Sequence, residues 1–227
     1  MPKGPEYDVF KVFQNQPEVL EAYAHLVELS DEHLNAGRAL LTASGGAQML
    51  VDLVFYGLTN RSWNVCDAIL ILVAKRNFVA AAPLVRIQMD TLLRLCYMRT
   101  LKQSDPFAKL ILSGQRLNKT KDAEGKLLTD ARLRDYARPR YPWIDKTYDE
   151  LSRLVHFSDA HIYSSMTPLK ADGSNTIHIG IGQTEESWPA SEVKNLLDLT
   201  ILLTEGILAH LSGWAKWKNE NYRPIKQ

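Results

Sequence analysis

Apolar residues recur at helical spacing through most of the chain. From Pro17 to Leu41 the apolar side chains lie three or four residues apart, which is the period of one face of a helix. Pro17 suits a first helical position, where the missing N–H costs no hydrogen bond. The segment "ASGGA" at 43–47 interrupts the pattern. These features predict a first long helix that ends just before this segment.

Two more long helical patterns follow. The pattern at 47–75 predicts either one helix or two helices with a joint near Thr59–Asn60. The next pattern runs from Phe78 to Leu101 and contains Pro83 near its start. Because proline lacks an N–H and clashes with the preceding turn, we expect regular helix there from about Ala82 onward.

The second half of the chain predicts shorter helices and one long final helix. Helices are expected at 106–118, 127–137 and 144–157, with a turn at "TKDAEGK" and a break at the two prolines of "ARPRYPW". A last helix enters through Pro189 and carries an apolar stripe that is wide enough to predict burial on most sides.

One segment departs from the helical period. Residues 169–183 combine the turn-like "DGSN" with the alternating "TIHIGIG", which is typical of a strand. Together with "YSSMTPLK" before it, this segment predicts a small β-hairpin near 163–183. Residues 1–16 contain two prolines and a glycine and predict a loosely ordered arm. The expected fold is therefore an all-α, multi-helix bundle with a small β-hairpin insertion, formed by a single domain at 17–227.

Composition narrows the class of protein. The 227 residues include 27 basic and 26 acidic side chains, so no overall charge favours nucleic acid or an anionic membrane. The N-terminus lacks the basic and apolar regions of a signal peptide. The most apolar run, "AILILVA" at 68–74, is far shorter than the roughly 20 residues that span a bilayer. We expect a soluble, cytoplasmic protein without membrane association.

Signals for metals, cofactors and common catalytic motifs are missing from the sequence. Cys66 and Cys96 both lie in apolar helical patterns and are expected to be reduced, buried thiols. The histidines lack the spacing of a metal site, and there is no P-loop, G-x-S-x-G or HExxH motif. We therefore expect neither a metal nor a cofactor.

The segment "YDELSRLVHFSDAH" at 148–161 offers the first candidate chemistry. On a helix, Tyr148, Ser152 and His156 stack at steps of four, at the edge of an apolar face. That face is formed by Ile144, Tyr148, Leu151 and Val155, which are expected to meet the core. A titratable imidazole at this boundary could act as an acid or base, or it could pack its ring within a structural hydrogen-bond network.

The segment "LVRIQMDTLLRLCYM" at 84–98 contains the second group of candidate functional residues. Arg86, Asp90 and Arg94 lie at steps of four on a largely apolar helix, so they form either a solvent face or a paired, partly buried network. If this line faces the Tyr148–Ser152–His156 line, Asp90 could orient His156 and the two guanidinium groups could attract an anion.

The two segments together resemble a known group of proteins. An "LxRxxxD/E" helix followed by "YxxLSxxVH" is similar to bacterial helical proteins of unknown function related to HEPN-like domains, over about residues 45–160. The resemblance implies a helical bundle, frequent dimers and, in active members, RNA cleavage in defence or toxin systems. Active members carry an arginine, four to six residues and a histidine. Here two residues separate Arg153 from His156, and seven separate Arg153 from His161.

Two hypotheses follow from these residues. In the first, RNA or a nucleotide phosphate binds in a cleft between the two helices. There His156 would be the acid or base, Asp90 its orienting group and Arg86 or Arg153 the phosphate clamp, with Tyr148, Ser152 and Arg94 as further binding residues. In the second, the protein is a non-enzymatic interaction module, a homodimer in which the same residues form a structural network.

A third, weaker signal lies between the two motifs. From Arg116 to Lys146 there are nine basic and five acidic residues with three aromatic residues among them. Such a segment either holds phosphate and stacks bases or is a charged, solvated connector.

Overall fold

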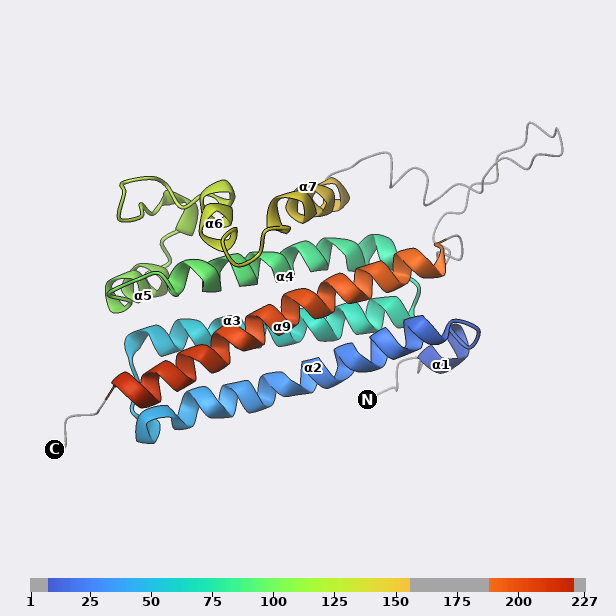
Figure 1. The fold of residues 1–227 in the computed structure, drawn as a ribbon, viewed down its shortest axis with the longest axis horizontal. Coiled ribbons are helices and arrows are strands. Elements are labelled where there is room, and N and C mark those ends of the chain that lie inside the picture. Colours follow the sequence, from blue (N-terminus) through green and yellow to red (C-terminus); the bar gives the residue numbers. More distant parts are fainter. Residues whose placement is uncertain (1–7, 156–187, 223–227) are drawn as a thin grey trace.

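The computed structural model describes residues 8–155 and 188–222. Four long helices lie side by side: α2 (Pro17–Thr42), α3 (Leu50–Ala74), α4 (Phe78–Met98) and α9 (Ala190–Asn221) (Figure 1). Three shorter helices follow α4 in the chain: α5 (Asp105–Leu112), α6 (Asp130–Ala137) and α7 (Ile144–Val155). Helices α6 and α7 pack on α4, and α5 packs on α3. The described residues contain no β-strand and only one isolated bridge, so they confirm the all-α prediction.

The described part of the N-terminal segment begins at residue 8. Residues 8–16, which were expected to belong to a loosely ordered arm, include the short helix α1 (Val9–Val12). Asp8 caps this helix, since its carboxylate accepts the backbone N–H of Phe10 at 3.1 Å. Val9 and Phe13 are buried. Residues 1–7 and the β-hairpin predicted near 163–183 lie outside the described residues.

Helix α2 begins at Pro17, as predicted, and a tight turn joins it to α3. Ser44 and Gly45 in this turn have φ values of 56° and 69°, the left-handed region that favours glycine. The backbone N–H of Ser44 donates to the side chain of Asn219 at 2.6 Å, which fastens the turn to the end of α9. Helix α3 is continuous through Thr59 and Asn60, so the alternative of two joined helices is wrong.

Helix α4 begins four residues earlier than predicted. Asn77 caps it by accepting the backbone N–H of Ala80 at 3.2 Å. Phe78, the first helical residue, is fully buried and stacks on Trp188, with 4.9 Å between the ring centroids. This cap and this burial stabilise a start at Phe78, and Pro83 is accommodated within the helix.

The helices at 106–118 and 127–137 are shorter than their patterns suggested. Helix α5 ends at Leu112, because the chain turns at Gly114 with a φ of 81°. A single 3-10 turn follows at Leu117–Lys119. Helix α6 starts only at Asp130, where the Thr129 hydroxyl accepts the backbone N–H of Arg132 at 3.4 Å.

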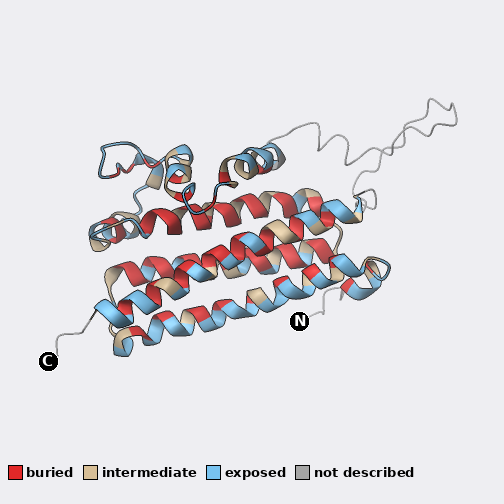
Figure 2. Ribbon diagram, viewed as in Figure 1, coloured by how far each residue is buried: buried red, intermediate tan, exposed pale blue. Residues whose placement is uncertain are grey.

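Helix α4 is the most enclosed of the long helices, because α3 and α9 lie on one side of it and α6 and α7 on the other (Figures 1 and 2). The predicted apolar stripe of α9 is largely buried, although Leu202 on another side is 41% exposed. Among the described helices α9 alone is long and apolar enough to cross a membrane, but 56% of its most apolar window is buried within the protein. A helix in the core of a protein can have the same length and apolar composition.

A buried ion pair joins the start of α3 to the end of α9. Asp52 and Lys218 form this pair, and their side chains are 1% and 0% exposed. The Asp52 carboxylate also accepts the indole N–H of Trp214 and the backbone N–H of Met49, both at 2.7 Å. These three protein donors take the place of the water molecules that would otherwise solvate the carboxylate.

Replacing Lys218 with methionine tests this interaction. The substitution keeps the length of the side chain but leaves a buried carboxylate without its counter-charge, so we expect the free energy of unfolding to fall by about 3–5 kcal/mol. Urea denaturation followed by circular dichroism measures the change. Lys216→Met, at an exposed position of the same helix, should change it by less than about 0.5 kcal/mol. Equal effects of the two substitutions would contradict the prediction.

Candidate functional site

The structure brings the two predicted segments together. Helices α4 and α7 pack against each other, and Arg86 of α4 faces Tyr148 of α7. The guanidinium carbon of Arg86 lies 3.7 Å from the centroid of the Tyr148 ring, and that of Arg134 from α6 lies 4.3 Å from the same centroid. The tyrosine ring is therefore held by cation–π contacts from two helices.

Arg86 is almost fully engaged by carboxylates. Its side chain is 10% exposed and forms ion pairs with Asp90, one helical turn away, and with Asp130 of α6 at 3.1 Å. The Tyr148 hydroxyl donates to the same Asp130 oxygen at 2.8 Å. One carboxylate thus joins an arginine of α4 to a tyrosine of α7. The predicted pairing of Arg86 with Asp90 is present, while Asp130 was not predicted.

These contacts fix the protonation states of the group. Burial lowers the pKa of Arg86, but the hydrogen bond and charge of Asp90 outweigh it and the net shift is upward. Burial and the bond to Asp130 raise the pKa of Tyr148, against the opposing charge of Arg86. Arg86 is therefore charged and Tyr148 a neutral phenol at physiological pH, which makes both better suited to holding structure than to proton transfer.

Some of the remaining predicted residues form contacts or lie on the surface of the described structure, and others lie outside the described residues. The Ser152 hydroxyl donates to the carbonyl of Tyr148 at 2.7 Å, within its own helix. Arg94 donates to the backbone carbonyl of Asp90 at 2.7 Å and lies 3.7 Å from its carboxylate. Arg153 is on the exposed side of α7. His156 and His161 lie outside the described residues, so the acid–base role of His156 stays a prediction.

The apolar face of α7 is only partly as predicted. Ile144 and Leu151 are buried in the core and Tyr148 is half-buried. Val155 was expected to join them but is 48% exposed. It is the last residue of α7.

Arg61 also belongs to this site, although it was not among the predicted site residues. Its side chain, from the middle of α3, is partly buried beside Arg94 and Asp90. Burial lowers the pKa of Arg61, the charge of Arg94 lowers it further, and Asp90 opposes both. Within the described part of the chain, no carboxylate lies within ion-pair distance of Arg61. The polar run "TNRSWN" at 59–64, which interrupts an apolar helix, was the available signal.

A serine–histidine pair also occurs, in the centre of the bundle. The Nδ1 atom of His33 lies 3.0 Å from the Leu29 carbonyl and 3.1 Å from that of Ser30, so Nδ1 carries the proton and Nε2 accepts the Ser62 hydroxyl at 2.8 Å. Such an arrangement could activate a nucleophile. However, Ser62 is 0% and His33 1% exposed, so no substrate can reach them. The pair is structural.

A cysteine–histidine pair lies between α4 and α9. Cys96 Sγ is 3.5 Å from His210 Nε2, and both residues are buried. Burial raises the pKa of Cys96 to about 12 and lowers that of His210 to about 4. The pair is therefore neutral, without the thiolate that cysteine chemistry requires. Cys66 is likewise a buried free thiol, as expected.

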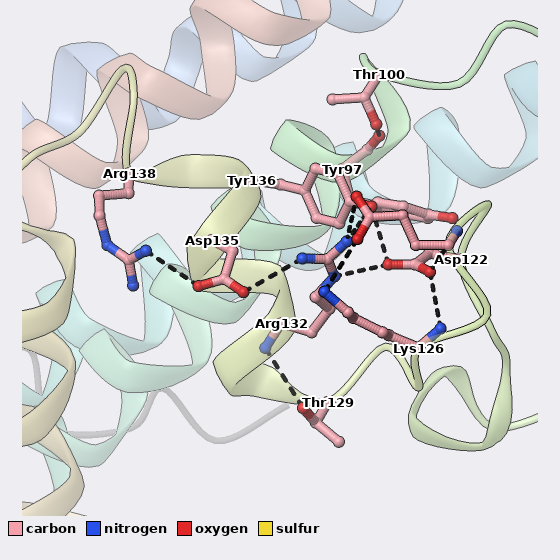
Figure 3. A network of polar contacts seen from close by, with 10 residues as sticks. Tyr97, Thr100, Asp122, Lys126, Thr129, Arg132, Asp135, Tyr136 and Arg138 are labelled. Atoms are coloured by element: carbon pink, nitrogen blue, oxygen red, sulfur yellow. Dashed lines mark hydrogen bonds and ion pairs between the residues drawn. The ribbon is translucent and has the colours of Figure 1, made fainter.

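The basic segment at 116–146 is largely self-neutralised (Figure 3). Asp122 accepts hydrogen bonds from Arg132 at 2.6 Å, from Tyr136 at 3.0 Å and from two backbone N–H groups at 2.9 Å. Burial would raise the pKa of Asp122, but these bonds lower it to about 2. Arg134 and Arg138 likewise pair with Asp145. Three arginines of this segment are thus paired with internal carboxylates, so they are not available to hold phosphate.

No protein-family model, curated protein or solved structure shows significant similarity to this chain. Within residues 8–155 and 188–222, no group of three or more histidine, cysteine, aspartate or glutamate side chains is arranged to hold a metal ion.

The buried histidines predict a pH dependence of stability. Burial lowers the pKa of His210 from 6.5 to about 4, with further lowering by Arg140 and Arg99, and burial also lowers the pKa of His33. The unfolded chain takes up protons below pH 6.5 that the folded chain does not, so the free energy of unfolding should fall as pH decreases from about 6.5 toward 4. Urea denaturation between pH 7.5 and 4.5 measures this slope and avoids the range in which Asp122 titrates.

One variant separates the contributions. His210→Gln should flatten the slope in part and leave the share due to His33. An identical slope in the wild type and His210→Gln would show that His210 does not take part.

Proposed function

We propose that the protein binds a phosphate-bearing ligand, RNA or a nucleotide. The site is the outer edge of the polar cluster formed by Arg61 of α3, by Arg86, Asp90 and Arg94 of α4, and by Tyr148 of α7. The observation that carries this proposal is a local shortage of negative charge. Arg61, Arg94 and Arg86 lie around Asp90, and Arg86 already occupies that carboxylate. Arg94 shares Asp90 with Arg86, and no carboxylate of the described residues lies within ion-pair distance of Arg61, so the guanidinium groups of Arg61 and Arg94 favour an anion that can bridge them.

In this proposal the inner residues of the cluster are a scaffold. The Arg86–Asp130–Tyr148 contacts hold α4, α6 and α7 together and so fix the position of Arg94, which lies two turns beyond Arg86 on α4. Arg61 and Arg94 would contact phosphate directly. The similarity of the sequence motifs to HEPN-like domains supports RNA as the ligand. His156 would be the acid or base of any RNA cleavage, and His156→Ala should then abolish cleavage while the fold remains intact.

Removing the two outer charges tests the binding site. Arg61→Gln with Arg94→Gln should weaken binding of a labelled single-stranded RNA by about tenfold or more. It should also reduce the slope of log affinity against log salt by about 1.4, because two phosphate contacts are lost. Fluorescence anisotropy at several salt concentrations measures both.

A matched variant separates this site from general charge. Lys109→Gln with Lys119→Gln removes the same charge from exposed positions on α5 and the following turn, and should leave affinity within about twofold. Equal losses in the two double variants, or no RNA binding by the wild type, would overturn the proposed site.

A second candidate function, a homodimeric interaction module, rests on a different surface. The outward face of α2 carries apolar residues seven positions apart: half-buried Leu20, then Val27, Leu34 and Leu41, which are 39%, 45% and 54% exposed. Exposed Asp31 and Arg38 alternate with them. We call this the α2 stripe. A seven-residue apolar repeat is the pattern by which two helices pack along each other.

The charges on the α2 stripe favour one arrangement of two copies. If two α2 helices pair antiparallel about Leu34, Val27 of each copy lies opposite Leu41 of the other. Asp31 then lies beside Arg38 of the other copy, twice by symmetry. A parallel pair would instead place like charges together. The stripe is therefore self-complementary only in the antiparallel arrangement.

Charge reversal tests the dimer. Asp31→Arg alone and Arg38→Asp alone should each weaken self-association by about tenfold, because each places like charges together twice. The combined variant restores both pairs and should recover it. Sedimentation velocity over a range of concentrations measures the association. Glu28→Arg, the same charge change off the stripe, serves as the control. A monomeric wild type, or a double variant weaker than either single variant, would exclude this arrangement.

A further inference from the structure

A pocket of about 560 Å³ lies at one end of the bundle, away from the arginine cluster. It is formed where the start of α3, the end of α4, the start of α5 and the end of α9 meet. Its lining combines tryptophan and methionine side chains with the cationic Arg99 and Lys102. This volume is within the range of small-molecule sites, which are mostly apolar with a few placed polar groups.

The aromatic wall of the pocket is a fixed stack. Phe55, Trp214 and Trp217 follow one another with 4.8 Å between successive ring centroids and interplanar angles of 13° and 21°. The hydrogen bond to Asp52 holds the middle ring in place. Trp217, the outermost ring, is 40% exposed. The indole ring of Trp217 stacks on Trp214 and is partly exposed to solvent, so it can stack against the aromatic ring of a ligand.

The two cations of the pocket form no ion pair with the described residues. Arg99 and Lys102 are exposed, and no carboxylate of the described chain lies within ion-pair distance of either. Asp105, the pocket's one acidic side chain, accepts the backbone N–H of Val51 at 3.3 Å. The positive charge of the two cations is therefore available to a ligand.

Gly213 of α9 positions Arg99. The guanidinium group lies across the helix at this residue, where an added Cβ would be 2.6 Å from Nη1. Glycine costs a helix interior about 1 kcal/mol relative to alanine, yet it occurs here beneath the arginine. The missing side chain lets Arg99 lie between the ends of α4 and α9.

We propose that this pocket binds a flat aromatic molecule that carries one anionic group. The ring stacks on Trp217, and the anion lies between Arg99 and Lys102. The aromatic ring alone lacks the contact with the two cations, and the anionic group alone lacks the stacking contact. The affinity of the molecule therefore depends on its carrying both groups. The site shares no residue with the Arg61–Arg94 site, and its occupancy does not depend on RNA binding.

Titration with 1-naphthyl phosphate tests the proposal, with tryptophan fluorescence and calorimetry on the full chain as readouts. It should bind at least about tenfold more tightly than 1-naphthol or inorganic phosphate, because each lacks one of the two contacts. Trp217→Ala and Arg99→Gln should each weaken binding by about tenfold or more. No binding up to millimolar concentration, or equal binding of the three probes, would overturn the proposal.

Gly213→Ala provides the sharper variant. Alanine favours the helix, so the fold is retained, while the new methyl group displaces Arg99 and should weaken 1-naphthyl phosphate binding by about tenfold. Gly57→Ala, where an added Cβ meets nothing within 4 Å, should leave binding unchanged. Arg61→Gln with Arg94→Gln should also leave it unchanged, which separates this pocket from the proposed phosphate site. Unaltered affinity in Gly213→Ala, with circular dichroism like that of the wild type, would refute the role of Arg99.

Discussion

One run of buried hydrogen bonds takes a side chain from each of the four long helices. His33 of α2 accepts from Ser62 of α3, and Gln88 of α4 donates to both Ser62 and Thr204 of α9, at 2.7–3.0 Å. Sliding any one helix by a residue would leave these polar groups unpaired in the core, which is costly at low dielectric. The run therefore fixes the register of the bundle. The contact of Asp52 on α3 with Lys218 on α9 depends on that register.

Internal pairing also determines where a ligand can act. Most buried or half-buried cations have protein partners: Lys218 has Asp52, Arg86 has two carboxylates, and Arg132 has Asp122. Such groups are already neutralised, so their contribution is to stability and position. Within the described residues, positive charge also remains available where cations outnumber nearby carboxylates. Both candidate ligand sites, one at the arginine cluster and one beside the tryptophan stack, are of this kind.

The helices were predictable because apolar spacing is a local property, whereas several boundaries and site members were not. Helix α4 starts at Phe78 because that ring meets Trp188, more than a hundred positions later in the chain. Arg86 and Asp90 pair within one helix, so their spacing alone indicated the contact. Asp130 and Arg61 come from other elements, and only the packing of α6 and α3 on α4 brings them to the cluster. For Arg61 the polar run at 59–64 was the available signal, and it does not indicate which residues of other helices Arg61 approaches.

The pairing of the first long helix with the last has a consequence for synthesis of the chain. Helix α2 packs on α9, and the turn after α2 is fastened to Asn219 (Figure 1). At roughly 5–20 residues per second, the ribosome completes α2, α3 and α4 seconds before α9 emerges. During that interval the apolar faces that α9 later covers are open to solvent, and the hydrogen-bond run through Thr204 is incomplete. The nascent chain therefore exposes these apolar faces until α9 packs on them, and this is the stage at which a chaperone would be needed.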